Sequence, residues 1–549
     1  MFDRTKKDWF KDLVIYQIYP KSFLDSNGDG IGDLDGIISK MDYLSSLGIN
    51  AIWLSPIYSS PFADNGYDIS DYRNINPLFG SLATFKEFLN EAHKRGIAVI
   101  MDLVVNHTSS EHEWFKKSVS GDEKYKDYYI WRDGKEGKEP NNWASSFGGS
   151  AWEYVEERGQ YYLHLFSKGQ PDLNWENEEV QKEILSMIEW WCSLGVDGFR
   201  VDAISYLEKA DFSYSPNKPD VDGYAFCMDI NSNKEGTHRL ISKIRTEVFD
   251  KYNVFSVGEV SCFKLSDFCD YSSKERKEFD IVIPFVPPEL EIKNWTPLKW
   301  KRDIKETYDA LKNDGWWARF MSNHDKPRQV SLYGDDKEYR EKSAILLATL
   351  NLLLPGTPFV YQGEEIGMTN VSYETIDDYD DIDTKNIYRR ELSHGKEEKE
   401  SFEYAKTVSR DNARSPMQWS DEENAGFSKG KPWLGVNPNY KEINVQNEEK
   451  NSNSILKYYR KLINLRQSSE TLRRGELSFI NFDSDVFVNF KRTLGSEEYV
   501  VLSNLSKEKN LLGFSLLGYD LVLSNYYLQR SESIYFMEPY EVVVLIKRK

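Results

Sequence analysis

The stretch Val196-Asp197-Gly198-Phe199-Arg200-Val201-Asp202-Ala203-Ile204 decides the fold. Its centre, residues 198–201, is typical of a short buried strand that follows a helical pattern and delivers the carboxylate of Asp202 at its end. A helix, a buried strand and then an acid at the strand's C-terminal end is the layout of an α/β barrel, where such acids are typically catalytic. On a strand, Arg200 and Asp202 point to the same side, so the arginine is expected to keep the carboxylate ionised. A purely structural Arg-Asp pair at a barrel mouth is the alternative.

Seven further strand candidates alternate with helical patterns along the chain. They span residues 14–18, 51–54, 98–105, 255–259, 281–283, 318–322 and 358–363. Together the eight strands predict an α/β fold of the (β/α)8 TIM barrel type. The alternation stops after the third strand, which predicts an inserted subdomain. Short alternating strands near the C-terminus predict an antiparallel β domain.

These changes of pattern divide the 549-residue chain into three parts. The catalytic barrel is expected over residues 1–106 and 174–471, the inserted subdomain over 107–173, and the C-terminal β domain over 472–549. Within the barrel part, residues 369–445 are polar and acidic, and we interpret them as a long excursion after the eighth strand.

Composition excludes several classes of partner. The formal net charge is -19, which argues against nucleic acid and anionic membranes and favours a neutral or cationic small ligand. The four cysteines, Cys192, Cys227, Cys262 and Cys269, lack metal-ligand spacing and are expected to be free thiols. No run approaches the roughly 18 apolar residues of a membrane span, and the N-terminus has no apolar signal region. A cytoplasmic protein without an organic cofactor is therefore expected.

Acidic residues end three of the predicted strands: Asp202, Glu259 and Asp325. Cleavage of a glycosidic bond with retention needs two carboxyl groups about 5–5.5 Å apart, one as nucleophile and one as acid and base. Glu259 follows an apolar strand, so a partly desolvated setting that raises its pKa suits the acid. His107 and His324 also follow strand ends, and neutral imidazoles are suitable donors to sugar hydroxyls.

Five motifs in order make the chain resemble the α-amylase superfamily of glycoside hydrolases (glycoside hydrolase family 13), in its oligo-1,6-glucosidase and α-glucosidase branch. They are Asp102-Leu103-Val104-Val105-Asn106-His107, Gln170-Pro171-Asp172-Leu173-Asn174, Gly198-Phe199-Arg200-Val201-Asp202, Val257-Gly258-Glu259 and Asn323-His324-Asp325. The second motif is typical of this branch, and the resemblance covers nearly the whole chain. It implies Asp202 as nucleophile, Glu259 as acid/base and Asp325 as transition-state stabiliser.

The resemblance also implies a site for the terminal sugar. Tyr67 would stack on the glucose at the cleavage point, while Asp64 and Arg410, or alternatively Arg414, would hold its far hydroxyls. Such a clamp blocks further sugar units, so exo action that releases one α-glucose at a time is expected. The other residues assigned to substrate binding are His107, Phe147, Phe166, Gln170, Arg200, Ala203 and His324.

A separate signal is the loop Asp25-Ser26-Asn27-Gly28-Asp29-Gly30-Ile31-Gly32-Asp33. Side-chain oxygens at its first, third, fifth and ninth positions, with Gly at the sixth, reproduce most of a calcium loop. An EF-hand is excluded because position twelve is Gly36 rather than Glu. The resemblance implies a structural Ca²⁺ or Mg²⁺ held by Asp25, Asn27, Asp29, the Ile31 carbonyl and Asp33. A solvated acidic turn is the alternative.

The linkage preference is predicted from the residue after the nucleophile. In this branch that residue is usually Val in enzymes that favour α-1,6 bonds and Ala or Thr in those that favour α-1,4 bonds. Ala203 therefore predicts a retaining exo-acting α-glucosidase with the α-1,4 linkage favoured, acting on small oligosaccharides or disaccharides. The alternatives are an oligo-1,6-glucosidase and a sucrose-active hydrolase or isomerase, although Lys299-Trp300-Lys301-Arg302-Asp303 departs from the isomerase pattern.

A protein of a different class is a further alternative. Transporter-associated proteins of this fold have no catalytic activity and carry a membrane anchor. This chain keeps all three acids and shows no anchor, which favours an enzyme.

Overall fold

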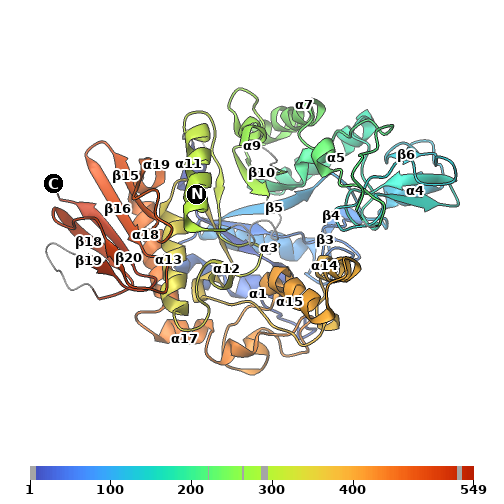
Figure 1. Ribbon diagram of the computed structural model, residues 1–549. Coiled ribbons are helices and arrows are strands. Elements are labelled where there is room, and N and C mark those ends of the chain that lie inside the picture. Colours follow the sequence, from blue (N-terminus) through green and yellow to red (C-terminus); the bar gives the residue numbers. More distant parts are fainter. Residues whose placement is uncertain are drawn as a thin grey trace.

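An eight-stranded parallel sheet forms the centre of the molecule (Figure 1). The computed structural model describes residues 6, 8–220, 222–261, 265–285, 295–527 and 535–548. The strands of the central sheet, in chain order, are β1 (Ile15–Ile18), β2 (Ala51–Leu54), β5 (Ala98–Val104), β9 (Gly198–Asp202), β10 (Phe255–Ser261), β11 (Ile281–Phe285), β12 (Ala318–Arg319) and β13 (Thr357–Tyr361). Their order in the sheet is β11-β10-β9-β5-β2-β1-β13-β12, and a parallel bridge between Val282 and Trp317 brings the two edges together. The predicted (β/α)8 barrel is confirmed.

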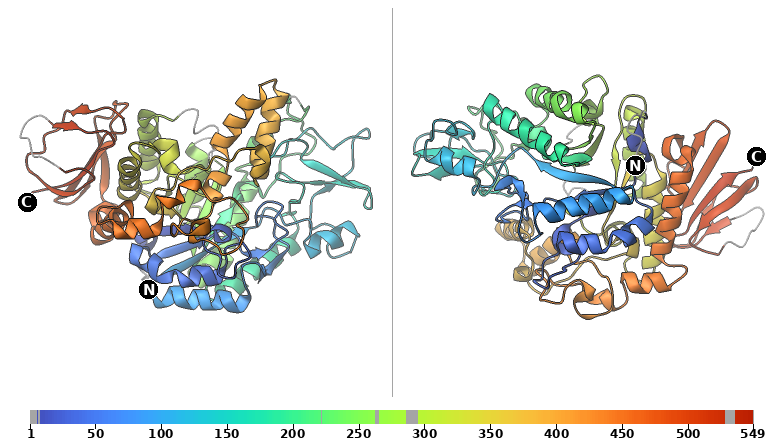
Figure 2. Two further views of the ribbon diagram at one scale, coloured as in Figure 1. Left: turned by 90° about the horizontal axis from the view of Figure 1, so that it is seen from below. Right: turned by 180° about the vertical axis from the view of Figure 1, so that it is seen from behind.

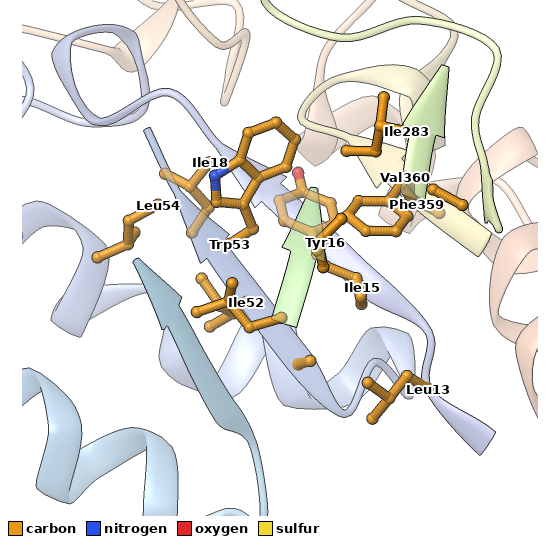
Figure 3. Packing of buried hydrophobic residues seen from close by; sticks show 14 of the residues in the cluster. Leu13, Ile15, Tyr16, Ile18, Ile52, Trp53, Leu54, Ile283, Phe359 and Val360 are labelled. Atoms are coloured by element: carbon orange, nitrogen blue, oxygen red, sulfur yellow. The ribbon is translucent and has the colours of Figure 1, made fainter. Parts of the chain in front are cut away.

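The barrel strands are buried because their sequences are almost continuously apolar, as strands covered on both faces must be. All seven residues of β5 are buried. Figure 3 shows side chains of β1, β2 and β13 packed together, and the rings of Trp53 and Phe359 meet edge to face at 5.9 Å. The seventh strand is shorter than predicted: only Ala318–Arg319 pairs in the sheet, and the following residues leave it.

Helices connect the strands on the outside of the barrel (Figures 1 and 2). They are α1 (Leu34–Ser39), α2 (Met41–Leu47), α3 (Leu82–Lys94), α5 (Glu178–Ser193), α7 (Glu235–Ile244), α8 (Asp250–Tyr252), α9 (Leu265–Ser272), α11 (Pro297–Leu311), α12 (Gln329–Tyr333), α13 (Arg340–Leu353) and α18 (Ile455–Ser468). Side chains cap several N-termini: Asn177 accepts from the amide of Glu179 at the start of α5, and Ser454 accepts from Lys457 at the start of α18.

The inserted subdomain follows β5. It contains α4 (Glu113–Val119) and an antiparallel sheet of β6 (Trp131–Arg132), β7 (Trp152–Val155) and β8 (Gln160–Leu163), in the order β6-β8-β7. A short hairpin of β3 (Tyr58–Ser59) and β4 (Asp71–Ile75) lies between β2 and α3. The apolar core of the subdomain, including Trp143 and Trp152, also contains Ala203 and Tyr206, which follow β9, and Met228 of α6 (Met228–Asn231). The subdomain is therefore packed directly on the segment that follows Asp202.

A helical hairpin lies within the polar excursion after β13. Its helices α14 (Ile382–Ser393) and α15 (Glu398–Val408) share a small apolar core of Ile387, Ala405 and Val408. Two shorter helices, α16 (Asp411–Arg414) and α17 (Val445–Lys450), follow. The hairpin reaches the inserted subdomain, because Asn386 donates to the carbonyl of Phe147 at 2.9 Å.

The C-terminal part is an antiparallel β structure at the opposite end of the molecule from the inserted subdomain (Figures 1 and 2). After α19 (Glu470–Arg474) come β14 (Glu476–Ile480), β15 (Asn489–Leu494), β16 (Glu497–Ser503), β17 (Asn510–Leu512), β18 (Tyr519–Ser524), β19 (Tyr535–Met537) and β20 (Val542–Lys547). The five-stranded sheet has the order β14-β15-β16-β20-β18, and β17 pairs with β19. Lys301 of α11, which is fully buried, donates to the carbonyls of Ser484 and Phe487 and so joins this part to the barrel.

Two further sequence-based expectations concern the described residues. Cys192, Cys227 and Cys269 carry thiols rather than disulfides, as expected, and the first two are buried; Cys262 lies outside the described residues. Within the described part of the chain, no helix combines the length and the apolar character that crossing a membrane would require.

Candidate active site

The guanidinium of Arg200 joins three carboxylates at the carboxyl ends of adjacent strands. Its Nη1 donates to Asp102 at 2.7 Å and to Asp202 at 2.8 Å, and its Nη2 donates to Glu259. Strands β5, β9 and β10 are neighbours in the sheet. The register places Asp102 opposite Arg200, whereas Asp202 and Glu259 lie two residues further along their strands, so the guanidinium reaches from the level of Asp102 to that of the other two acids. Arg200 is 1% exposed, and a charge buried this deeply is tolerated only when it is paired.

Two of these carboxylates are accessible and the third is not. The side chains of Asp202 and Glu259 are each 12% exposed, whereas that of Asp102 is fully buried. The second oxygen of Glu259 accepts from the backbone amide of Ala203 at 3.2 Å. Ala203 adopts the left-handed conformation with φ of 45°, and this turn after β9 aims its amide at Glu259. Asp202 and Glu259 are therefore both fixed and both open to a ligand.

Asp325 lies in the segment after β12 and faces two arginines. It accepts from Nη2 of Arg414 at 2.8 Å and from Nη1 of Arg410 at 3.4 Å, and His324 Nε2 lies 3.1 Å from its other oxygen. Burial alone would raise the pKa of Asp325, but His324 and the two guanidinium groups lower it below its usual value. Asp325 is therefore ionised at neutral pH.

His324 is neutral and stacked on Tyr67. Burial lowers the pKa of His324 to about 3, against the opposing effect of Asp325. Its Nδ1 lies 2.8 Å from the side-chain amide nitrogen of Gln17, which can only donate, so Nδ1 is the acceptor. In the neutral ring the proton is therefore on Nε2. The rings of Tyr67 and His324 stack with centroids 5.3 Å apart, and the Tyr67 hydroxyl donates to Asp102 at 3.0 Å. The Tyr67 hydroxyl also lies 2.6 Å from His324 Nε2, so Asp102 and His324 together fix the hydroxyl end of the tyrosine.

The remaining predicted sugar-binding residues form a connected group beside the acids. Asp64 accepts from Gln170 at 3.1 Å and from Arg410 at 3.3 Å, and the Gln170 amide also lies 3.1 Å from His107. Phe166 packs against His107 at 5.2 Å between ring centroids. The ring of Phe147 lies 6.2 Å from that of Phe166 and 5.5 Å from the guanidinium carbon of Arg410. The structure thus brings together the predicted residues from the barrel and from the inserted subdomain.

Sequence reasoning missed three residues of this site. Asp381 binds Arg410 through two hydrogen bonds, Trp53 donates to Asp102 at 3.2 Å, and Gln17 orients His324. Gln17 carried a usable signal, because a polar residue inside an apolar barrel strand needs a partner. Asp381 directly precedes a helical pattern, which marks it as a helix N-cap but not as a partner of an arginine.

The loop of residues 25–33 lies against the excursion after β13. Asp25 accepts from the amides of Asn27, Gly28 and Gly30 and from the hydroxyl of Ser428. Burial would raise the pKa of Asp25, but these hydrogen bonds lower it. The other predicted oxygen donors also take part in turns: Asn27 accepts from Asp29, Asp29 accepts from Ile31, and Asp33 accepts from Ser26 and Gly36. Carboxylate, amide and carbonyl oxygens suit Ca²⁺ or Mg²⁺. In the described ranges, however, no three His, Cys, Asp or Glu side chains are grouped as metal ligands.

A (β/α)8 barrel that gathers its carboxylates at the carboxyl ends of neighbouring strands has the arrangement that glycoside hydrolysis needs. The chain belongs to the α-amylase family, because the family profile described as "Alpha amylase, catalytic domain" matches residues 17–475. The protein is therefore a glycoside hydrolase.

Named relatives refine this placement. The chain is 46% identical over 547 residues to an oligo-1,6-glucosidase of Parageobacillus thermoglucosidasius, covering 96% of each chain. It is similar to the crystal structure of a trehalose-6-phosphate hydrolase of Bacillus licheniformis (TM-score 0.91, 43% identity, 98% of this chain and 100% of that one). It is also similar to a mutant isomaltulose synthase of Erwinia rhapontici NX5 in complex with sucrose (TM-score 0.93, 38% identity, 98% and 99%).

The carboxylates around Arg200 predict an acidic limb in the pH profile. Burial is the main cause that raises the pKa of Asp102 to about 6, with Glu259 adding to the rise and Arg200 opposing it. Burial and the neighbouring carboxylates also raise the pKa of Asp202. Raised pKa values mean that these carboxylates bind protons at a higher pH than usual, so kcat/KM should fall as the pH drops below about 6. Because the carboxylates are close together, this acidic limb reports the titration of the cluster rather than of one residue.

Asp102→Asn tests this assignment because it removes one negative charge from the cluster. The acidic limb of kcat/KM for p-nitrophenyl α-glucoside should then move down by roughly one pH unit. Asp42→Asn, at a side chain that is 91% exposed, is the matched control and should leave the limb in place. An unshifted limb in Asp102→Asn would show that the cluster does not control it.

Proposed function

We propose that the protein is a retaining, exo-acting glycosidase that releases glucose from the non-reducing end of short α-glucosides. The bridging of Asp202 and Glu259 by one guanidinium carries this proposal. A retaining glycosidase needs two carboxyl groups about 5–5.5 Å apart, and two carboxylates bound to the same Arg fork are held at close range.

The contacts of each acid support a distinct role in this proposal. Asp202 is the nucleophile, and its pairing with Arg200 favours the charged form that attacks the anomeric carbon. Glu259 donates a proton to the leaving oxygen and later accepts one from the attacking water. Asp325, kept ionised by Arg410 and Arg414, stabilises the positive charge that develops on the sugar ring.

Exo action is supported by the Asp64 and Arg410 pair. These two side chains lie 3.3 Å apart and are linked through Gln170 to His107. Charged and amide groups placed together in this way can bind the outer hydroxyls of one sugar and leave no path for a longer chain. The substrate we propose is a small neutral oligosaccharide, in keeping with the net charge of -19, and neither nucleic acid nor a membrane is required.

Among linkages we favour α-1,6, as in the oligo-1,6-glucosidase that is 46% identical to this chain. The α-1,4 preference predicted from Ala203 has no support from the named relatives. It remains the second candidate because of residue 203 itself, which is Ala in a left-handed conformation with φ of 45°, where a β-branched side chain would be strained.

A substrate panel separates these candidates. We expect kcat/KM for isomaltose to exceed that for maltose by about tenfold or more, because differences of 1–3 kcal/mol in fit are typical of such discrimination. Trehalose 6-phosphate and sucrose test the activities of the other two named relatives, and p-nitrophenyl α-glucoside serves as the reference substrate whose leaving group is not a sugar. A tenfold preference for maltose would establish the α-1,4 alternative instead.

We also propose that the loop of residues 25–33 binds a structural Ca²⁺ or Mg²⁺. The spacing of its oxygen donors and the chain of turns that orients them support this site. When bound, the ion would neutralise the carboxylates of Asp25, Asp29 and Asp33 and fix the loop against the excursion after β13.

Metal binding predicts a thermal midpoint that depends on the ion. With Ca²⁺ at about 100 times its Kd, a bound ion stabilises the fold by about 2.7 kcal/mol, so EGTA should lower the midpoint by about two degrees in a chain of this length. Asp29→Asn keeps the turn but loses a charge, and it should abolish most of the difference between the thermal midpoints in Ca²⁺ and in EGTA. Asp35→Asn, at an exposed residue just beyond the loop, is the control. A wild-type midpoint that is equal in Ca²⁺, Mg²⁺ and EGTA would refute the site.

A further inference from the structure

We propose that Asp381 is a positioning residue that orients Arg410 and thereby sets the affinity for the non-reducing-end sugar. This inference rests on the proposed function, in which Arg410 and Asp64 bind that sugar. It means that a residue at the N-terminus of α14, outside the barrel strands, contributes to sugar affinity.

Arg410 is held more closely by Asp381 than by either residue of the active site. Its Nε and Nη2 donate to the same oxygen of Asp381 at 2.9 and 2.6 Å. The contacts to Asp64 and Asp325 are longer, at 3.3 and 3.4 Å. The edge of the guanidinium that carries Nε and Nη2 is thus anchored on Asp381. This anchor leaves Nη2 directed also at Asp64 and Nη1 directed at Asp325.

Asp381 is itself fixed and inaccessible. It is fully buried and is the N-cap of α14, where its second oxygen accepts from the amide and the hydroxyl of Thr384 at 3.1 and 2.7 Å. Its own amide donates to Asp411 at 3.0 Å. Asp381 therefore has no surface with which to contact a sugar. It acts on the site through arginines: Arg410, which it binds directly, and Arg414, whose Nη1 lies 3.8 Å from the same Asp381 oxygen.

The surrounding charges explain why such an anchor is needed. Arg410 lies between Asp64, which we assign to sugar binding, and Asp325, which we assign to the transition state. Without Asp381 the rigid guanidinium fork would be free to close on Asp325 and pair with it fully. With Asp381 in place, Arg410 stays between Asp64 and Asp325 and keeps N–H donors available for sugar hydroxyls.

Asp381→Asn is the sharpest test because asparagine keeps a capping oxygen for α14 but loses the charge that holds Arg410. We expect the KM for p-nitrophenyl α-glucoside and the inhibition constant of free glucose to rise together by about tenfold, with kcat changed less than about threefold. Glu400→Gln removes the same charge from an exposed side chain of the same hairpin, 64% exposed, and should change neither constant by more than about twofold.

A double-mutant cycle shows whether Asp381 acts through Arg410. Arg410→Lys keeps the positive charge but loses the fork, so Asp381→Asn should change KM by less than about twofold in that background. The proposal is overturned if Asp381→Asn alone leaves KM within twofold of the wild type. It is also overturned if Asp381→Asn raises KM equally in both backgrounds.

Failure of the proposed function is distinguishable from failure of this inference. If the wild type releases no glucose from any α-glucoside of the panel, the proposed function falls. Crystal structures of the wild type and of Asp381→Asn then measure the positioning directly. A guanidinium of Arg410 that moves toward Asp325 in the variant supports the inference, and one that stays in place contradicts it.

Discussion

The buried guanidinium of Arg200 is the interaction on which the rest of the site depends. A charge that is 1% exposed must be neutralised by groups that reach it, and here three carboxylates from neighbouring strands do so. The side chain of Asp102 is fully buried beside the guanidinium, while those of Asp202 and Glu259 are partly exposed. One arginine therefore holds together the two acids that we assign to catalysis, and it opposes the rise that burial causes in the pKa of Asp202. The order of β5, β9 and β10 in the barrel is what makes this possible.

Structure outside the barrel then completes the site around these acids. The inserted subdomain shares its core with Ala203, whose amide orients Glu259, so the packing of that subdomain bears directly on the geometry of one acid. The helical hairpin after β13 supplies Arg410 with its anchor, Asp381, and touches the subdomain through Asn386. The barrel strands thus provide the acids, while the subdomain and the hairpin supply or anchor several of the side chains to which we assign sugar binding.

The sequence predicted the parts of this arrangement that depend on local pattern. Apolar strands that end in acids predicted the barrel and placed Asp202, Glu259 and Asp325 at its carboxyl end, because strand ends meet at one edge of a parallel sheet. The contact between Arg200 and Glu259 was not predicted, since it depends on the register of two strands. Asp381 was missed for a similar reason: an acid before a helix predicts an N-cap, and only the tertiary fold brings an arginine to it. The linkage preference depends on the shape of the site beyond the cleaved bond, which one residue could not define.

The most direct test of the account is to trap the covalent intermediate. A 5-fluoro-α-glucosyl fluoride forms a glycosyl-enzyme slowly and hydrolyses more slowly still, so mass spectrometry of the proteolysed protein can locate the sugar. The account predicts one fluoroglucosyl group per chain on the peptide that contains Asp202, and none in Asp202→Asn. A label on Glu259, or turnover of the reagent without any adduct, would contradict the assignment of Asp202 as the nucleophile.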